Sequence, residues 1–477
     1  MKKILVASAN PWAFALAAER HIIRSHSADR VDLLNMFTLC SRFSPIWRRR
    51  DRQIELVNRK IQRFVRPIIN GREITGQIDM SGLKVPVPVA TPGQVRSYRI
   101  GDAAIGLGVL STVSSVTTIR EPEQLSDYGP AFLESWETAH RSWWIGEAVR
   151  EMGYDQVYIF NGRVDFARPF SDVIQKTARV TTYEQGGTGQ HYIMADGQIL
   201  EPQVFARVVQ DHTFDLAAGE EFYLERIHRK PGNEASFFTE GMKTDHIPEG
   251  LERGSYVAFY PSSSDELAFI RDDPFYGEFA TQFEVAHELA RICKDTRRKL
   301  VIRLHPHLQH KNQIWRREWD FNSLDALDVF VIPPEDPCDS YALSRGARCV
   351  VTCGSTVSFE STFMGVPNAV VGEAVGNLIG ASARVMTRAE LRTFVDTASL
   401  PERAKEQALI YGSFNKVSGT LLEELDTGRH PNFARIDGKI VDPVRAAVQL
   451  VRELSRRRQD HSSAGFADGK VIVLARK

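Results

Sequence analysis

The sequence lacks the features that mark secreted, membrane-spanning or disulfide-rich proteins. Its 477 residues contain five cysteines, an odd number without paired spacing, which predicts a reduced cytoplasmic protein without a cysteine metal site. No apolar run approaches the roughly eighteen residues that a helix needs to cross a bilayer. The apolar run at the amino terminus is short and leads directly into a strand and turn, so we do not expect a signal peptide.

Net charge and two nucleotide motifs are also absent. The 60 basic residues balance 60 acidic ones, so no global field would recruit nucleic acid, and none is expected as a partner. The opening strand Lys3–Ala7 predicts a Rossmann-like start, but no Gly-x-Gly-x-x-Gly follows it, so a dinucleotide redox cofactor is unsupported. No Asp-x-Asp motif follows a predicted strand, which favours chemistry without a bound metal.

Two buried-strand patterns between Lys299 and Glu373 each end in a polar turn. The first is a branched apolar run that ends at His305-Pro306. The second leads into Gly354-Ser355-Thr356, where glycine allows close backbone approach and the hydroxyls can cap a helix or bind an anion. A lone histidine or such a turn is usually structural. Here the histidine and the turn each follow the carboxyl end of a predicted parallel strand. This arrangement favours a binding site, because ligands bind at those ends in open α/β sheets.

A family resemblance follows from these motifs and their neighbours. The residues that carry it are Arg303-Leu-His305-Pro306, Asp339-Ser-Tyr341, Val350 to Thr356, Glu360 and Gly365-Val-Pro367. Together they resemble bacterial capsule polysaccharide biosynthesis proteins, which are GT-B glycosyltransferases related to 3-deoxy-manno-octulosonic acid transferases and bacterial polysialyltransferases. The close match covers roughly 256–373, and a weaker one extends upstream to about Tyr154.

The resemblance implies an α/β fold of two Rossmann-like lobes facing a cleft, with C-terminal helices crossing back to the first lobe. We expect an acceptor lobe at 1–250 with a basic and irregular insertion at about 45–101, a nucleotide-sugar lobe at 251–440, and a helix and polar tail at 441–477. The implied function is transfer of a sugar from a nucleotide-sugar donor to a glycan or lipid-linked acceptor in surface polysaccharide biosynthesis. The implied reaction inverts the anomeric centre and uses no cofactor beyond that co-substrate.

The expected donor site collects polar groups of the second lobe. Departure of the sugar leaves negative charge on a phosphate, which fixed hydrogen-bond donors can stabilise. The residues expected to bind the donor are Ser263, Ser264, His305, Pro306, Gly354, Ser355, Thr356, Glu360 and Glu373. Glu373, one strand after the Gly-Ser-Thr turn, is expected to accept hydrogen bonds from ribose hydroxyls, and His305 is also expected to act in catalysis.

The expected general base lies in the first lobe. Two predicted parallel strands, at 156–160 and 179–183, end in polar turns, and the second turn begins Glu184-Gln185-Gly186-Gly187. The resemblance implies that Glu184 takes the proton from the acceptor hydroxyl. The family usually has a second acid where this chain has Gln185. Two alternatives therefore stay open: Glu184 only orients the acceptor, or Asp165 is the base.

Residues 48–72 are strongly basic, with apolar residues at helical spacing. This pattern predicts either a solvated helix packed on its own lobe or a peripheral contact with anionic lipid at the inner face of the cytoplasmic membrane. Three other functions stay open for the whole chain: a nucleotide-sugar epimerase, a polyol-phosphate transferase of the same shape, and a non-catalytic polysaccharide assembly protein.

Overall fold

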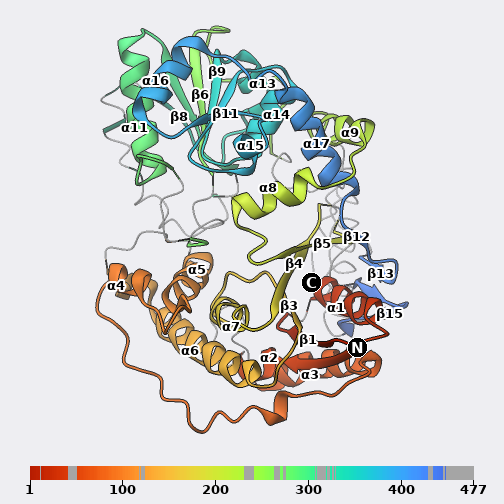
Figure 1. Ribbon diagram of the computed structural model, residues 1–477. Helices are drawn as coiled ribbons and strands as arrows, with labels where there is room; N and C mark the ends of the chain where they lie inside the picture. Colours follow the sequence, from red (N-terminus) through yellow and green to blue (C-terminus); the bar gives the residue numbers. More distant parts are fainter. Residues whose placement is uncertain are drawn as a thin grey trace, which may run out of the picture.

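A computed structural model provides the fold (Figure 1). It describes residues 1–10, 12–40, 51–117, 119, 124–187, 189–229, 241–262, 269–271, 276–306, 308, 319, 323–324, 327, 329–427, 433–443 and 446, with the backbone alone at 51–54 and 57. The chain forms two α/β lobes, each built on a six-stranded sheet.

The first sheet has the strand order β12-β5-β4-β3-β1-β2. Its strands are β1 (Lys3–Ser8), β2 (Arg30–Asn35), β3 (Gln156–Phe160), β4 (Arg179–Gln185), β5 (His191–Asp196) and β12 (Thr420–Leu421). The strands β1 to β4 pair in parallel. The β5 strand runs antiparallel to β4, and β12 runs antiparallel to β5. Apolar residues of β1 to β4 contribute to one buried core, as expected for strands covered on both faces.

Helices of varied length complete the first lobe. They are α1 (Ala13–Ser25), α2 (Met36–Cys40), α3 (Asp51–Phe64), α4 (Pro92–Ser97), α5 (Ile105–Thr117), α6 (Pro130–Arg150) and α7 (Arg168–Ile174), with 3-10 turns η1 (Arg66–Ile68), η2 (Thr75–Gln77) and η3 (Leu125–Tyr128). No helix among the described residues combines the length and apolarity needed to cross a membrane.

The second sheet is parallel throughout, in the order β11-β10-β9-β6-β7-β8. Its strands are β6 (Tyr256–Tyr260), β7 (Lys299–Arg303), β8 (Val329–Ile332), β9 (Cys349–Thr352), β10 (Asn368–Val371) and β11 (Ala383–Val385). Its helices are α11 (Gln282–Asp295), α13 (Ser340–Gly346), α14 (Val357–Phe363), α15 (Val375–Leu378) and α16 (Arg388–Thr397). Strand order reverses between β6 and β9, which makes this point the topological switch of a doubly wound fold.

Three helices join the lobes: α8 (Pro202–Gln210), α9 (Leu216–Ile227) and α17 (Ala404–Val417). They share one apolar core with Ile193 of β5 and Phe359 of α14, so the junction is packed like a protein interior. The α17 helix, blue in Figure 1, runs from the second lobe toward β12, which joins the first sheet. The expected crossing back to the first lobe is thus confirmed.

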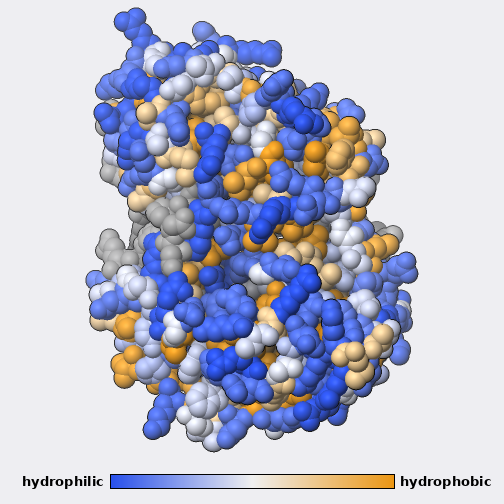
Figure 2. Space-filling model, in the orientation of Figure 1, coloured by the Kyte–Doolittle hydropathy of each residue, from blue (hydrophilic) through white to orange (hydrophobic). Residues whose placement is uncertain are grey.

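The chain continues beyond β12 on the first lobe. The small antiparallel sheet β13 (Leu425–Asp426), β14 (Arg435–Ile436) and β15 (Lys439–Ile440) lies against α1. There, buried Arg20 donates to Glu424 at 2.9 Å and also pairs with Asp437. The face in Figure 2 is mostly hydrophilic and narrows between the lobes, and apolar groups gather near α9 and α17, which expose Leu224 and Val417.

Three local features differ from the sequence expectations. The β4 strand continues through Gln185, so Glu184 lies within the strand and not in the turn after it. Its antiparallel partner β5 was not predicted. Inside the region expected to be irregular, α4 forms because Thr91 and Gln94 make reciprocal capping hydrogen bonds.

Candidate functional site

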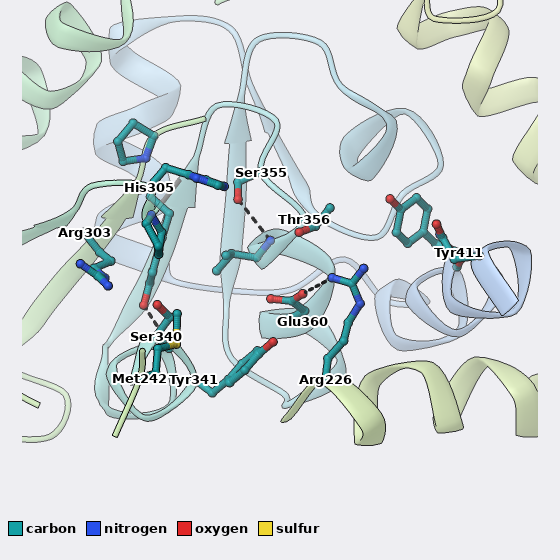
Figure 3. A pocket seen from close by; sticks show the side chains of 15 residues that line it. Arg226, Met242, Arg303, His305, Ser340, Tyr341, Ser355, Thr356, Glu360 and Tyr411 are labelled. Carbon is teal, nitrogen blue, oxygen red and sulfur yellow. Dashed lines mark hydrogen bonds and ion pairs between the residues drawn. The ribbon is translucent and has the colours of Figure 1, made fainter. Parts of the chain in front are cut away.

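A cavity of about 290 Å³ opens at the carboxyl edge of the second sheet (Figure 3). Its walls combine the ends of β6, β7 and β9 with α9, α13, α14 and α17. The lining residues are Arg226, Met242, Tyr260, Pro261, Arg303, His305, Pro306, Ser340, Tyr341, Ser355, Thr356, Val357, Glu360, Tyr411 and Asn415. Five of the expected donor-site residues, His305, Pro306, Ser355, Thr356 and Glu360, therefore line one cavity beside the topological switch point.

The turn after β9 supplies the hydroxyl groups. Gly354 has φ +95°, a conformation that favours glycine. Ser355 Oγ accepts from the backbone N–H of Val357 at 3.4 Å, which places this hydroxyl at the start of α14. The side chain of Thr356 makes no capping bond and is exposed. Of the two expected capping residues, Ser355 thus makes a weak cap, and Thr356 keeps its hydroxyl for other partners.

The turn after β6 is tied to the same place. Ser262 Oγ donates to the carbonyl of Cys353 at 2.9 Å, which joins the two turns that flank the switch point. The Ser262 amide in turn donates to Gln282 Oε1 of α11 at 2.8 Å. Ser263 and Ser264, the expected phosphate ligands of this turn, lie outside the described residues.

One wall of the cavity carries an ion pair that sequence reasoning missed. Arg226 Nη1 of α9 donates to Glu360 Oε1 of α14 at 3.1 Å, and both side chains are largely buried. Burial raises the pKa of Glu360, and the charge and hydrogen bond of Arg226 oppose that rise. Arg226 lies 134 residues before its partner, so no local pattern in the sequence marked it.

The loop before α13 closes another wall. Asp339 caps α13, as predicted, by accepting from the backbone N–H groups of Tyr341 and Ala342 at 3.0 and 3.2 Å. Tyr341 is buried, and Figure 3 shows its hydroxyl directed toward Glu360. Arg303, the last residue of β7, donates to the carbonyls of Pro333 and Asp336 and so fixes the turn after β8.

Glu373, which was expected to bind the donor, is not among the residues that line this cavity. Its carboxylate accepts from Arg271 and Arg384, each at 2.7 Å, and from Gln203 Nε2 at 3.4 Å. The hydrogen bond from Arg271 is the main cause that lowers the pKa of Glu373. Gln203 belongs to α8, so Glu373 links the second sheet to the helices that join the lobes.

Glu184 lies in β4 of the first lobe and is not among the residues that line the cavity. Asn161 Nδ2 donates to Glu184 Oε2 at 2.7 Å, and burial raises the pKa of the carboxyl group while that bond and Arg163 oppose the rise. The turn that follows reaches α17: a Cβ on Gly187 would lie 2.3 Å from the carbonyl oxygen of Asn415, a lining residue.

The alternative base and the basic segment are placed differently. Asp165 has no exposed surface, and its Oδ1 accepts from the backbone N–H of Phe166 at 2.9 Å, so it has no access to an acceptor.

In the basic segment, α3 buries Ile61 and Phe64 against the first lobe, which supports a helix packed on its own lobe. Residues 48–50 lie outside the described residues, and contact with lipid stays a prediction.

Metal binding stays untested. Within the described ranges, no group of three or more histidine, cysteine, aspartate or glutamate side chains has the arrangement of a metal site. The prediction of metal-independent chemistry therefore still rests on the sequence.

Comparisons with known proteins give no family assignment. No protein-family model matches the chain, and no curated protein matches it. Among solved structures, the KpsC β-Kdo 2,7-transferase of Thermosulfurimonas dismutans is similar over 56% of this chain and 79% of its own, at 12% identity and a TM-score of 0.34. The UDP-GlcNAc 2-epimerase of Methanocaldococcus jannaschii, in complex with UDP-GlcNAc and UDP, is similar over 86% of this chain and 98% of its own, at 11% identity and a TM-score of 0.29.

Proposed function

We propose that this protein is a glycosyltransferase that moves a sugar from a nucleotide-sugar donor to a glycan or lipid-linked acceptor. The observation that carries the proposal is the cavity at the switch point of a doubly wound sheet, where His305, Ser355 and Thr356 come together. Nucleotides bind at this place in such sheets because strand ends and loops diverge there and leave room for a ligand.

The fixed charge of the cavity suits an anion. Its described lining includes two arginines, Arg226 and Arg303, and one carboxylate, Glu360, which leaves one positive charge in excess before His305 is counted. His305 and the hydroxyls of Ser355 and Thr356 add donors that can face a phosphate. Of the two glutamates expected at the donor, Glu360 lines the cavity, and we assign to it hydrogen bonds with donor hydroxyl groups.

These groups would act on the leaving phosphate. As the bond between the sugar and the phosphate breaks, negative charge grows on the phosphate oxygens, and preorganised donors stabilise it more strongly than they stabilise the bound donor. Loss of one such donor typically costs about 2.7–4 kcal/mol of transition-state stabilisation. His305 and Ser355 are the residues to which we assign this role.

Glu184 is the proposed general base. Burial raises the pKa of its carboxyl group, which makes Glu184 a stronger proton acceptor than an exposed glutamate. The acceptor hydroxyl would attack the sugar from the side of the first lobe as the phosphate leaves toward the second, and such direct displacement inverts the anomeric centre. Contact between Gly187 and Asn415 joins the base's turn to the cavity wall.

Nucleotide binding is the first test. Thermal unfolding of the parent protein would be measured with UDP, CDP, GDP and ADP, their monophosphates and representative nucleotide sugars. A ligand at about 100 times its dissociation constant stabilises the native state by about 2.7 kcal/mol, so the correct base should raise the melting temperature clearly. His305→Ala and Ser355→Ala should reduce that rise, whereas His287→Ala, on α11 outside the cavity lining, should not. An equal rise in the parent and in His305→Ala would contradict the assignment.

A second measurement separates transfer from epimerisation. A transferase releases nucleotide in proportion to glycosylated acceptor, whereas an epimerase changes the sugar while it stays linked to the nucleotide and needs no acceptor. Membrane fractions and capsule oligosaccharides would serve as acceptor sources. Nucleotide-linked epimer formed by the purified protein alone would favour the alternative.

A further inference from the structure

Arg226 lines the cavity but lies on α9, one of the three helices that join the lobes. It lies in the last turn of α9, between the lobes, and its side chain is 14% exposed. In Figure 3 its guanidinium group points toward Glu360, on the opposite side of the drawn residues from His305. The cavity therefore has cationic or donor groups on two separate walls.

The guanidinium group is held in place before any ligand binds. The ring of Phe222, one turn earlier on α9, lies 4.3 Å from the guanidinium carbon, and Glu360 accepts from Nη1. Guanidinium carries five N–H donors in a planar fork. Within the described residues only the bond to Glu360 uses one of them, so further donors remain at the cavity wall.

The spacing between the two walls is set by α14. Thr356 and Glu360 are four residues apart at the start of this helix, which separates them by about one helical turn, roughly 5–6 Å. The hydroxyls of Ser355 and Thr356 lie at one level along α14, and the Arg226–Glu360 pair lies about one helical turn further along. Two neighbouring phosphoryl groups joined by a bridging oxygen can contact both levels, whereas a single phosphoryl group at the Ser355–Thr356 turn leaves Arg226 without an anionic ligand.

An ion pair that only stabilises the fold need not face the cavity. Buried pairs that only stabilise a fold contribute little net free energy, because desolvation offsets their attraction. The Arg271–Glu373 pair serves as a comparison: its burial is similar, at 15% and 13% exposed, but neither residue is among those that line the cavity. The Arg226–Glu360 pair faces the space where an anion is expected.

We propose that Arg226 binds the second phosphoryl group of the donor, and that the donor is a nucleoside diphosphate sugar and not a nucleoside monophosphate sugar. This inference rests on the proposed function and specifies its donor class. The guanidinium fork contacts two oxygens of that phosphoryl group while Glu360 keeps the side chain in position. Arg226 then also stabilises charge on the leaving diphosphate.

The test compares nucleoside diphosphates with monophosphates of the same base by isothermal titration calorimetry. The probes are UDP and UMP, CDP and CMP, GDP and GMP, and ADP and AMP. The parent protein should bind the diphosphate of its preferred base about tenfold or more tightly than the monophosphate, which is the effect of one charge-assisted contact. Arg226→Gln should abolish that preference and leave monophosphate affinity within about twofold.

Two further variants keep the result interpretable. Arg226→Lys retains the charge without the planar fork and should keep part of the preference. Arg271→Gln, which breaks the matched pair outside the cavity, should keep all of it. Equal affinity of the parent for both ligands would overturn the inference and leave the proposed function intact. Equal weakening of both ligands in Arg226→Gln would assign Arg226 a structural role and also overturn it. Failure of the parent to bind any nucleotide would overturn both proposals.

Discussion

Replacing Glu19 by glutamine should change the stability of the first lobe by an amount that depends strongly on pH. Glu19 of α1 has no exposed surface, and Tyr183 donates its hydroxyl to Glu19 Oε1 at 3.0 Å. Burial raises the pKa of Glu19 from 4.5 to about 8 and thus keeps the carboxyl group protonated in the folded protein at neutral pH. In the unfolded chain the group ionises near 4.5. Folding must then take up a proton between these two pKa values.

The sign and size of the effect follow from that uptake. Between pH 4.5 and about 8 the folded state binds more protons than the unfolded state, so stability falls as pH rises, by about 1.4 kcal/mol per unit. Between pH 5 and pH 8 the loss reaches roughly 3 kcal/mol. Glu19→Gln keeps the shape and an acceptor for Tyr183 but cannot ionise, so it removes this loss. Any fixed cost of the amide is the same at both pH values.

The assay is thermal unfolding of the parent and the Glu19→Gln variant at pH 5 and pH 8. For a lobe of this size roughly 3 kcal/mol corresponds to about 6–12 °C, so the variant's melting temperature relative to the parent should rise by that amount between the two pH values. The same replacement at Glu151, which is exposed, should produce no such rise. A difference between parent and Glu19→Gln that is identical at both pH values would refute the argument.

Two further predictions concern the edge of the first sheet. Glu184→Gln should leave nucleotide affinity near normal and lower transfer roughly 10²- to 10⁴-fold; in the parent, kcat/KM should fall as pH drops through the raised pKa of Glu184, with a midpoint above 4.5, and full turnover in the variant would remove Glu184 as the base. Gly187→Ala should push the turn away from Asn415 and destabilise the fold by about 1–3 kcal/mol, as seen in chemical denaturation. Gly93→Ala, where an added Cβ meets nothing within 4 Å, is the matched control, and equal stability of the two variants would contradict the packing argument.

The parallel core could be predicted from sequence because its signals are local. The β3 strand begins and ends where its apolar run predicts, and the strand before His305 was recognised from its branched residues. The turns after β7 and β9 could be predicted because Pro306 and Gly354 end the strand patterns. Since parallel strands present their carboxyl ends at one edge, the meeting of these turns in one cavity was also predictable.

The missed features depend on contacts between distant parts of the chain. The β5 strand is defined by its neighbours in the sheet. It pairs with β4 on one side and, on the other, with β12, which lies more than two hundred residues later. Arg226 gains its place only when α9 packs on α17 and meets α14. The partners of Glu373 were not predicted either, because Arg271 and Gln203 lie 102 and 170 residues before it in the sequence. Such partners leave no periodic mark in a single sequence.

If the proposed function is correct, the cavity of the second lobe holds a nucleotide sugar whose bond to phosphate is broken there. Phosphorus NMR of the nucleotide sugar that stabilises the protein most, incubated with the protein and a cell-envelope acceptor fraction, tests it directly. Resonances of the released nucleotide should appear and grow with acceptor, and His305→Ala should slow their appearance by about a hundredfold or more. A nucleotide sugar that keeps its bond to phosphate while its sugar changes configuration, or release at the same rate in His305→Ala, would contradict the proposed function.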